Sequence, residues 1–151
     1  MKPFTFRFCA CLLTIVFLTS CNSLPKQKVD DQPRRIELLF LGHASEHHHS
    51  RKYVPILMSA LSKDGMNITY TEDVNDLNSE KLSLYDGLVL YANHEKITGP
   101  HVQSLLDYVA DGHAFLPIHC ASFCFNESED YVDLVGGQFK THGTGVFTSA
   151  I

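Results

Sequence analysis

Short apolar segments alternate with stretches of helical periodicity in this chain, and this alternation restricts the fold more than any other feature. Four segments are short and rich in branched and aromatic side chains, as expected for buried strands: Ile36–Leu41, Met66–Thr71, Gly87–Tyr91 and Ala114–His119. Strands separated by helices form right-handed βαβ units, whose strands run parallel. The sequence therefore predicts an α/β, flavodoxin-like three-layer fold with a mainly parallel sheet.

The segments between these strands predict the covering helices. Glycines follow two of them as stop signals, and a Thr-Gly-Pro sequence is typical of a helix start. Pro117 lacks an amide donor, so it should lie near the end of the fourth strand. The expected helices are Tyr53–Lys63 before Gly65, Ser79–Leu82, a helix capped by Thr98 with Pro100 in its first turn and Gly112 at its end, and Tyr131–Leu134.

The N-terminus has the pattern of an export signal. Lys2 and Arg7 precede the apolar run Phe8–Phe17, which is shorter than the ~20 apolar residues of a membrane-spanning helix. Leu18–Cys21 resembles the lipobox that lipoprotein signal peptidase reads. This resemblance implies that Cys21 becomes the lipid-bearing first residue of the mature protein. The alternatives are an ordinary secretory signal and an uncleaved anchor.

We therefore expect a signal peptide at residues 1–20, the lipidated cysteine and a flexible tether at 21–35, and a single domain at 36–151. The tether segment is polar and contains two prolines. The protein would be exported and held at a bacterial membrane, in the cell envelope. Loss of residues 1–20 leaves 10 basic and 17 acidic residues, and such an acidic chain is a poor partner for nucleic acid.

Cys120 and Cys124 are the two cysteines left once the signal and Cys21 are set aside. Export would place them where disulfides persist. Their spacing allows a disulfide or two free, buried thiols, and it is not a zinc or thioredoxin motif.

Histidines gather after the predicted strands. In open parallel sheets, ligands bind beyond the carboxyl ends of the strands, where the loops meet. Imidazole is both a metal ligand and a base near neutral pH, so this edge is the expected site. Each candidate histidine or asparagine could instead be an exposed side chain or one with a purely structural role. The candidates are His43 and His47 after the first strand, Asn93 and His94 after the third, His119 at the end of the fourth, and His142 in a glycine-rich turn.

Four segments together resemble the ThuA-like (trehalose-utilisation) domain, whose fold is related to class I glutamine amidotransferases. They are LFLGHASEHHHSRKYVPIL, YDGLVLYANHEKIT, LLDYVADGHAFLPIHCASFCF and GGQFKTHGTGVFT. The resemblance extends from about Arg35 to Ile151. It implies a sugar-related ligand and a divalent metal such as zinc as the cofactor to test for.

Two departures from the family pattern matter. The amidotransferase relatives place a nucleophilic cysteine where His119 stands here, and Cys120 follows one residue later, on the other face. Classical amidotransferase activity is therefore not expected. The chain also ends after Val146–Thr148, which has the pattern of a strand. We expect the domain to be incomplete at its C-terminus.

The sequence thus predicts an exported ThuA-like lipoprotein with a histidine-rich pocket, acting on a small carbohydrate. His119 is the expected catalytic residue, His43, His47 and His142 are the expected metal ligands, and Asn93 and His94 are expected to bind ligand. The alternatives are a non-catalytic carbohydrate-binding lipoprotein and a hydrolase that uses Cys120. Two hypotheses also stay open for the imidazole rings: they hold a zinc ion, or they form hydrogen bonds to sugar hydroxyls with no metal.

Overall fold

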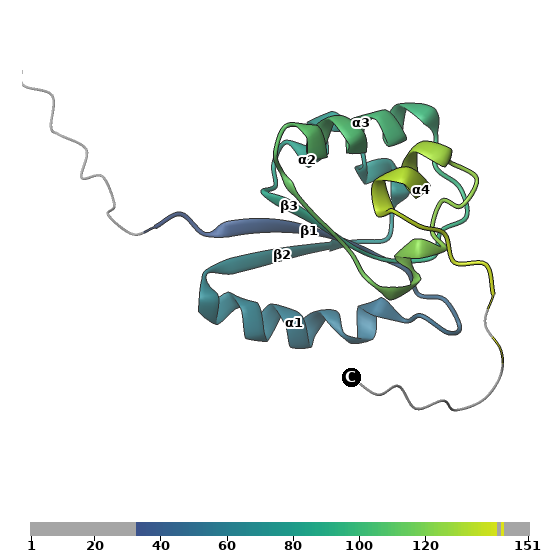
Figure 1. The fold of residues 1–151 in the computed structure, drawn as a ribbon. Coiled ribbons are helices and arrows are strands. Elements are labelled where there is room, and N and C mark those ends of the chain that lie inside the picture. Colours follow the sequence, from purple (N-terminus) through teal and green to yellow (C-terminus); the bar gives the residue numbers. More distant parts are fainter. Residues whose placement is uncertain (1–32, 142, 144–151) are drawn as a thin grey trace, which may run out of the picture. The chain divides into compact units, whose positions relative to one another are not determined.

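The computed structural model describes residues 33–141 and residue 143. Within them, four parallel strands form one sheet with helices on both faces (Figure 1), which confirms the expected α/β fold. The strands are β1 (Ile36–Gly42), β2 (Met66–Thr71), β3 (Gly87–Tyr91) and β4 (Ala114–Pro117), and the helices are α1 (Val54–Leu61), α2 (Ser79–Leu82), α3 (Gly99–Ala110) and α4 (Glu129–Val135).

The strand order β2-β1-β3-β4 creates a switch point between β1 and β3. The chain leaves β1 through α1 to reach β2 on one side, then returns across β1 to build β3 and β4 on the other. The connections beyond β1 and β3 therefore diverge to opposite faces of the sheet. Such a divergence opens a crevice at the carboxyl ends of these two strands, where ligands of open α/β sheets bind.

Alternate residues of the central strand pack on opposite faces of the sheet. Leu39 and Leu41 belong to the core beneath α2, α3 and α4, while Phe40 packs with Val54 and Ile68 beneath α1. All three β1 residues are fully buried. This explains why β1 has a continuous apolar sequence rather than an alternating one.

Three local expectations were wrong in detail. The fourth strand ends at Pro117 rather than His119, because the chain turns into a short 3₁₀ helix, His119–Ser122. Thr98 occupies the N-cap position of α3, but its side chain makes no capping hydrogen bond. The last helix begins earlier than Tyr131, because the Ser128 hydroxyl caps it by accepting a hydrogen bond from the Tyr131 amide.

The remaining features fit the expected pattern. Pro117 is the last residue of β4, and Gly65 ends the turn after α1 with a φ of 80°, in the region that favours glycine. Cys120 and Cys124 are free and buried. Among the described residues, no helix is long and apolar enough to cross a membrane. The expected signal, the Cys21 lipid and His142 lie outside these residues.

Candidate active site at the carboxyl edge of the sheet

The loop after β1 is closed by the buried hydroxyl of Ser50. This oxygen accepts a hydrogen bond from the His43 amide at 2.8 Å and donates one to the His43 carbonyl at 3.2 Å. Gly42 leaves room for the closure, because a Cβ there would overlap the Ser50 oxygen and the Tyr70 ring. The small residue at the end of β1 thus fixes where His43 emerges.

His43 and His94 meet across the switch point. Nδ1 of His43 lies 2.7 Å from Oδ1 of Asn93, and Nε2 of His94 lies 3.0 Å from the Gly42 carbonyl. Because both oxygens accept, each of these ring nitrogens carries the proton. In the neutral form of His94 the other ring nitrogen, Nδ1, is therefore unprotonated.

The two rings form a stack with Phe125. The His43 and His94 centroids are 4.2 Å apart and the planes differ by 20°, while the Phe125 ring lies 6.3 Å beyond His94. Burial lowers the pKa of His94, and the charge of the neighbouring His43 lowers it further. The stack therefore favours an uncharged His94.

His119 occupies the turn directly after β4. Its φ of 51° is in the left-handed region, which costs energy for a residue with a Cβ. His48 contacts it edge-on with centroids 4.9 Å apart, and the Tyr91 ring lies 6.1 Å away. Burial lowers the pKa of His48, with further contributions from His119 and His47. His48 is therefore biased towards its neutral form, which can accept a proton.

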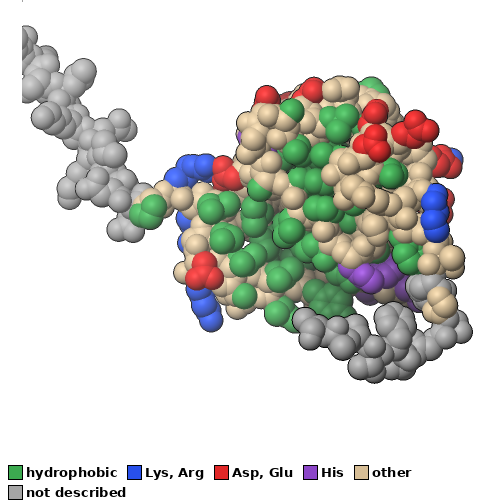
Figure 2. All heavy atoms as spheres, viewed as in Figure 1, with side chains coloured by type: hydrophobic (Ala, Val, Ile, Leu, Met, Phe, Trp, Pro, Cys, Tyr) green, Lys and Arg blue, Asp and Glu red, His purple; other side chains and the backbone are tan. Residues whose placement is uncertain are grey.

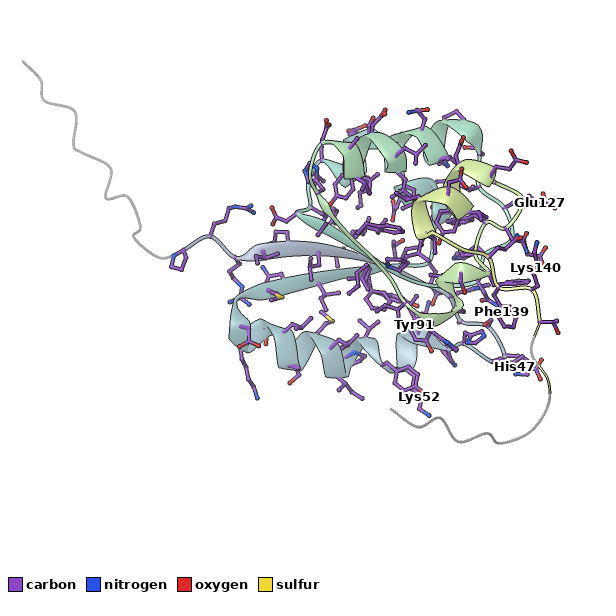
Figure 3. The ribbon with its side chains drawn as sticks, viewed as in Figure 1. His47, Lys52, Tyr91, Glu127, Phe139 and Lys140 are labelled. Carbon is purple, nitrogen blue, oxygen red and sulfur yellow. The ribbon has the colours of Figure 1, made fainter. Side chains whose placement is uncertain are left out.

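A pocket of about 380 Å³ is lined by His48, His119 and their neighbours. Two aromatic rings, Phe123 and Phe139, meet edge to face on its wall with centroids 6.4 Å apart. Figure 3 shows His47, Tyr91 and Phe139 at the same end of the sheet, and Figure 2 shows a patch of histidine side chains on the face in view. The lining residues are His47, His48, Asn93, His119, Cys120, Ser122, Phe123 and Phe139.

Cys120 is poorly suited to act as a nucleophile. Its side chain is buried, and burial raises the pKa of the thiol to about 11. The reactive form of cysteine is the thiolate, which would be scarce near neutral pH. The thiol instead contributes an apolar part of the pocket floor.

The structure brings several of the sequence candidates together. His47, Asn93 and His119 line one pocket, while His43 and His94 lie behind Asn93 in the ring stack. His142 is outside the described residues. Within the described part of the chain, no group of three His, Cys, Asp or Glu is placed to hold a metal.

Sequence reasoning missed His48, Ser122 and the two phenylalanines. His48 lies in a run of three histidines, and the sequence of this run does not determine which of the three rings points towards the pocket. The hydrogen bonds between Ser45 and His48 set that turn. The aromatic signal of Phe123 and Phe139 was present in the sequence, but no pattern placed the two rings against each other.

The lowered pKa values of His94 and His48 predict a stability that falls with acidification. The unfolded chain binds protons at an ordinary imidazole pKa of 6.5, whereas these folded rings bind them at lower pH. The free energy of unfolding should therefore decrease as the pH falls from 6.5 through the folded pKa values. Urea titrations at several pH values measure this slope.

The variants His94→Gln and His49→Gln provide the control. In His94→Gln the new side chain keeps a donor for the Gly42 carbonyl but has no titrating ring, so the slope below pH 6.5 should become shallower. His49 is exposed in the β1 loop, and its replacement should leave the slope nearly unchanged. Equal slopes in all three proteins would contradict this explanation.

The parallel sheet, its switch point and the pocket beyond the strands define a flavodoxin-like α/β protein with a candidate ligand site at the carboxyl edge. Residues 37–150 match the model of the ThuA family, described as trehalose utilisation. The chain therefore belongs to the ThuA family.

A solved structure supports the same fold. A ThuA-like protein from Bacteroides uniformis ATCC 8492 is 19% identical to this chain, with a TM-score of 0.55. The match covers 74% of this chain and 47% of that protein, so the chain spans about half the length of this relative. None of the curated proteins matches the sequence.

Proposed function

We propose that the pocket binds a small carbohydrate, and that the protein acts in carbohydrate utilisation as an exported, lipid-anchored member of the ThuA family. The observation that carries this proposal is the composition of the pocket wall. Imidazole and amide groups of His48, Asn93 and His119 share one cavity with the rings of Phe123 and Phe139.

This combination matches the surface of a sugar. A pyranose ring has faces of C–H groups, which pack on aromatic rings, and an edge of hydroxyls, which need donors and acceptors. A largely apolar cavity with a few placed polar groups is the usual form of a small-molecule site. The volume of about 380 Å³ is within the range of such sites.

The proposed catalytic step is proton transfer rather than attack by cysteine. His48 is biased towards the neutral form and contacts His119, so this pair can take a proton from a sugar hydroxyl and return it. The protonated thiol of Cys120 favours this over a cysteine hydrolase. A binding protein without turnover is the second candidate, and it requires only the aromatic wall and the polar groups.

Zinc in the pocket is a separate proposal. The described residues alone do not supply three suitably placed ligands, so the described donor set does not fit a zinc centre. Zinc would need a ligand from elsewhere in the chain, for which the sequence suggests His142. The direct hydrogen-bonding account needs no such ligand.

Calorimetry with trehalose and other small glucosides tests the proposal. The wild-type protein should bind one of these sugars, and His119→Ala should weaken binding by about tenfold, the effect of losing one or two hydrogen bonds to a ligand. His49→Ala is the control, because His49 is an exposed histidine in the loop after β1 that does not line the pocket. This variant should bind as the wild type does.

Each outcome discriminates between the accounts. Binding that survives a chelator supports direct recognition by the side chains, and binding that is lost with the chelator and restored by zinc supports the metal. Release of a cleaved or altered sugar supports the enzyme, whereas binding without turnover supports the binding protein. Equal affinity of wild type and His119→Ala would contradict the assigned pocket.

A further inference from the structure

Helix α1 has no charged residue, although it covers one face of the sheet and its outer side is at the surface of the domain. Its sequence is VPILMSAL, and only Val54 is buried. A surface helix normally carries polar side chains on its outer face, and a helix that is apolar all round normally has another layer over it. In α1 the outward residues Ile56 and Met58 are 66% and 42% exposed. This outer face therefore has the character of a contact surface.

The surroundings of α1 carry positive charge. Residues 51–64 contain Arg51, Lys52 and Lys63 and one acidic residue, Asp64, and Arg51 is paired with Glu72. By contrast, residues 73–141, which include α2, α3 and α4, contain 3 basic and 11 acidic residues. Figure 3 shows Lys52 extending away from the domain at the start of α1. The apolar face is therefore flanked by cations in a protein that is otherwise acidic.

We propose that the outer face of α1, together with Tyr53, Lys52 and Lys63, docks on an anionic lipid surface. This inference rests on the proposed lipid anchor, which would hold the domain near a bilayer. Ile56, Met58 and Tyr53 would enter the boundary between headgroups and acyl chains, while the flexible stems of Lys52 and Lys63 bring their ammonium groups to the headgroups. The acidic layer on the other side of the sheet would then face away from the membrane.

Charge argues against a second copy as the occupant. If two α1 helices packed antiparallel about a two-fold axis, Lys52 of one copy would lie near Lys63 of the other. The neighbouring Asp64 offsets part of this repulsion, but residues 51–64 contain three basic residues and one acidic residue, so two copies would still bring like net charge together. An anionic bilayer complements the net positive charge of this segment, so it fits the charge pattern better.

Anchoring makes weak docking sufficient. A short tether keeps the domain at high local concentration above the lipid, so the face needs little affinity of its own. Membrane docking of this kind depends on both apolar area and charge. The apolar area and charge of this face should nevertheless let the mature, unlipidated chain bind anionic vesicles measurably, and neutral vesicles weakly.

Cosedimentation of the mature chain, residues 21–151 with Cys21→Ser, tests this. Vesicles of phosphatidylcholine with phosphatidylglycerol are compared with phosphatidylcholine alone. Ile56→Glu should reduce binding to the anionic vesicles by about fivefold or more, because it places a charge in the contact face. Leu84→Glu is the matched control, since Leu84 is 65% exposed outside α1, and it should change binding by less than about twofold.

Lys52→Gln with Lys63→Gln tests the charge separately, and should weaken binding most at low salt. Circular dichroism confirms that the variants are folded.

No binding to anionic vesicles, or equal losses in Ile56→Glu and Leu84→Glu, would overturn the proposal. A dimer that Ile56→Glu abolishes, without vesicle binding, would assign the face to a second copy. The assay uses neither acyl chain nor sugar, so its failure is distinguishable from failure of the anchor or the pocket.

Discussion

Replacing Phe125 with alanine should lower the free energy of unfolding by about 3–5 kcal/mol, the usual cost of removing a buried phenyl ring. Phe125 is fully buried. Its ring meets Tyr131 edge-on with centroids 5.1 Å apart and lies against His94 on the other side. The loss would therefore affect both the core and the support of the histidine stack.

Phe123→Ala is the control for this prediction. Phe123 is a partly buried ring on the pocket wall, so its removal should cost clearly less stability. Urea unfolding of both variants at neutral pH gives the comparison, and the ring signals of His94 should shift in Phe125→Ala alone. Equal losses in the two variants would show that Phe125 is not the main support of this region.

Cys21→Ser should abolish lipid attachment, because a serine oxygen cannot form the thioether of a bacterial lipoprotein. This prediction rests on the proposed anchor. Wild-type protein from the membrane fraction should carry acyl mass on its first mature residue, and the variant should carry none. Mass spectrometry of the N-terminal peptide measures the difference directly.

Cys120→Ser is the matched control for the anchor. Cys120 is a buried thiol within the domain, so its replacement should leave the acyl mass on Cys21 unchanged. Unmodified Cys21 in membrane-associated wild-type protein would contradict the lipid anchor. In that case the domain would have to reach the membrane by another route, such as the face of α1.

Much of the fold could be predicted because its strands are buried on both faces. A strand such as Gly87–Tyr91 must then be apolar throughout, and its bounds were predicted correctly from that run. The strand order, and with it the switch point, was harder to predict from the sequence. The order of elements along the chain can be read from local patterns, but the position of β1 between β2 and β3 depends on packing that no local pattern encodes.

The site was predictable in position and less so in detail. Parallel strands bring their carboxyl ends to one edge, so the meeting of Asn93 and His119 follows from topology. The inward turn of His48 depends on hydrogen bonds within its loop, and the early end of β4 depends on the left-handed backbone of His119. Such features arise from local geometry that hydrophobic periodicity does not report.

The most direct test of the proposed carbohydrate pocket is a titration of the mature protein with trehalose, or with the small glucoside that binds best, followed by NMR of the imidazole signals. The signals of His48 and His119 should shift progressively and saturate with the sugar. Those of His101 and His113, which do not line the pocket, should stay in place. Saturable shifts confined to His101 or His113, or no shifts for any sugar that calorimetry shows to bind, would contradict the site.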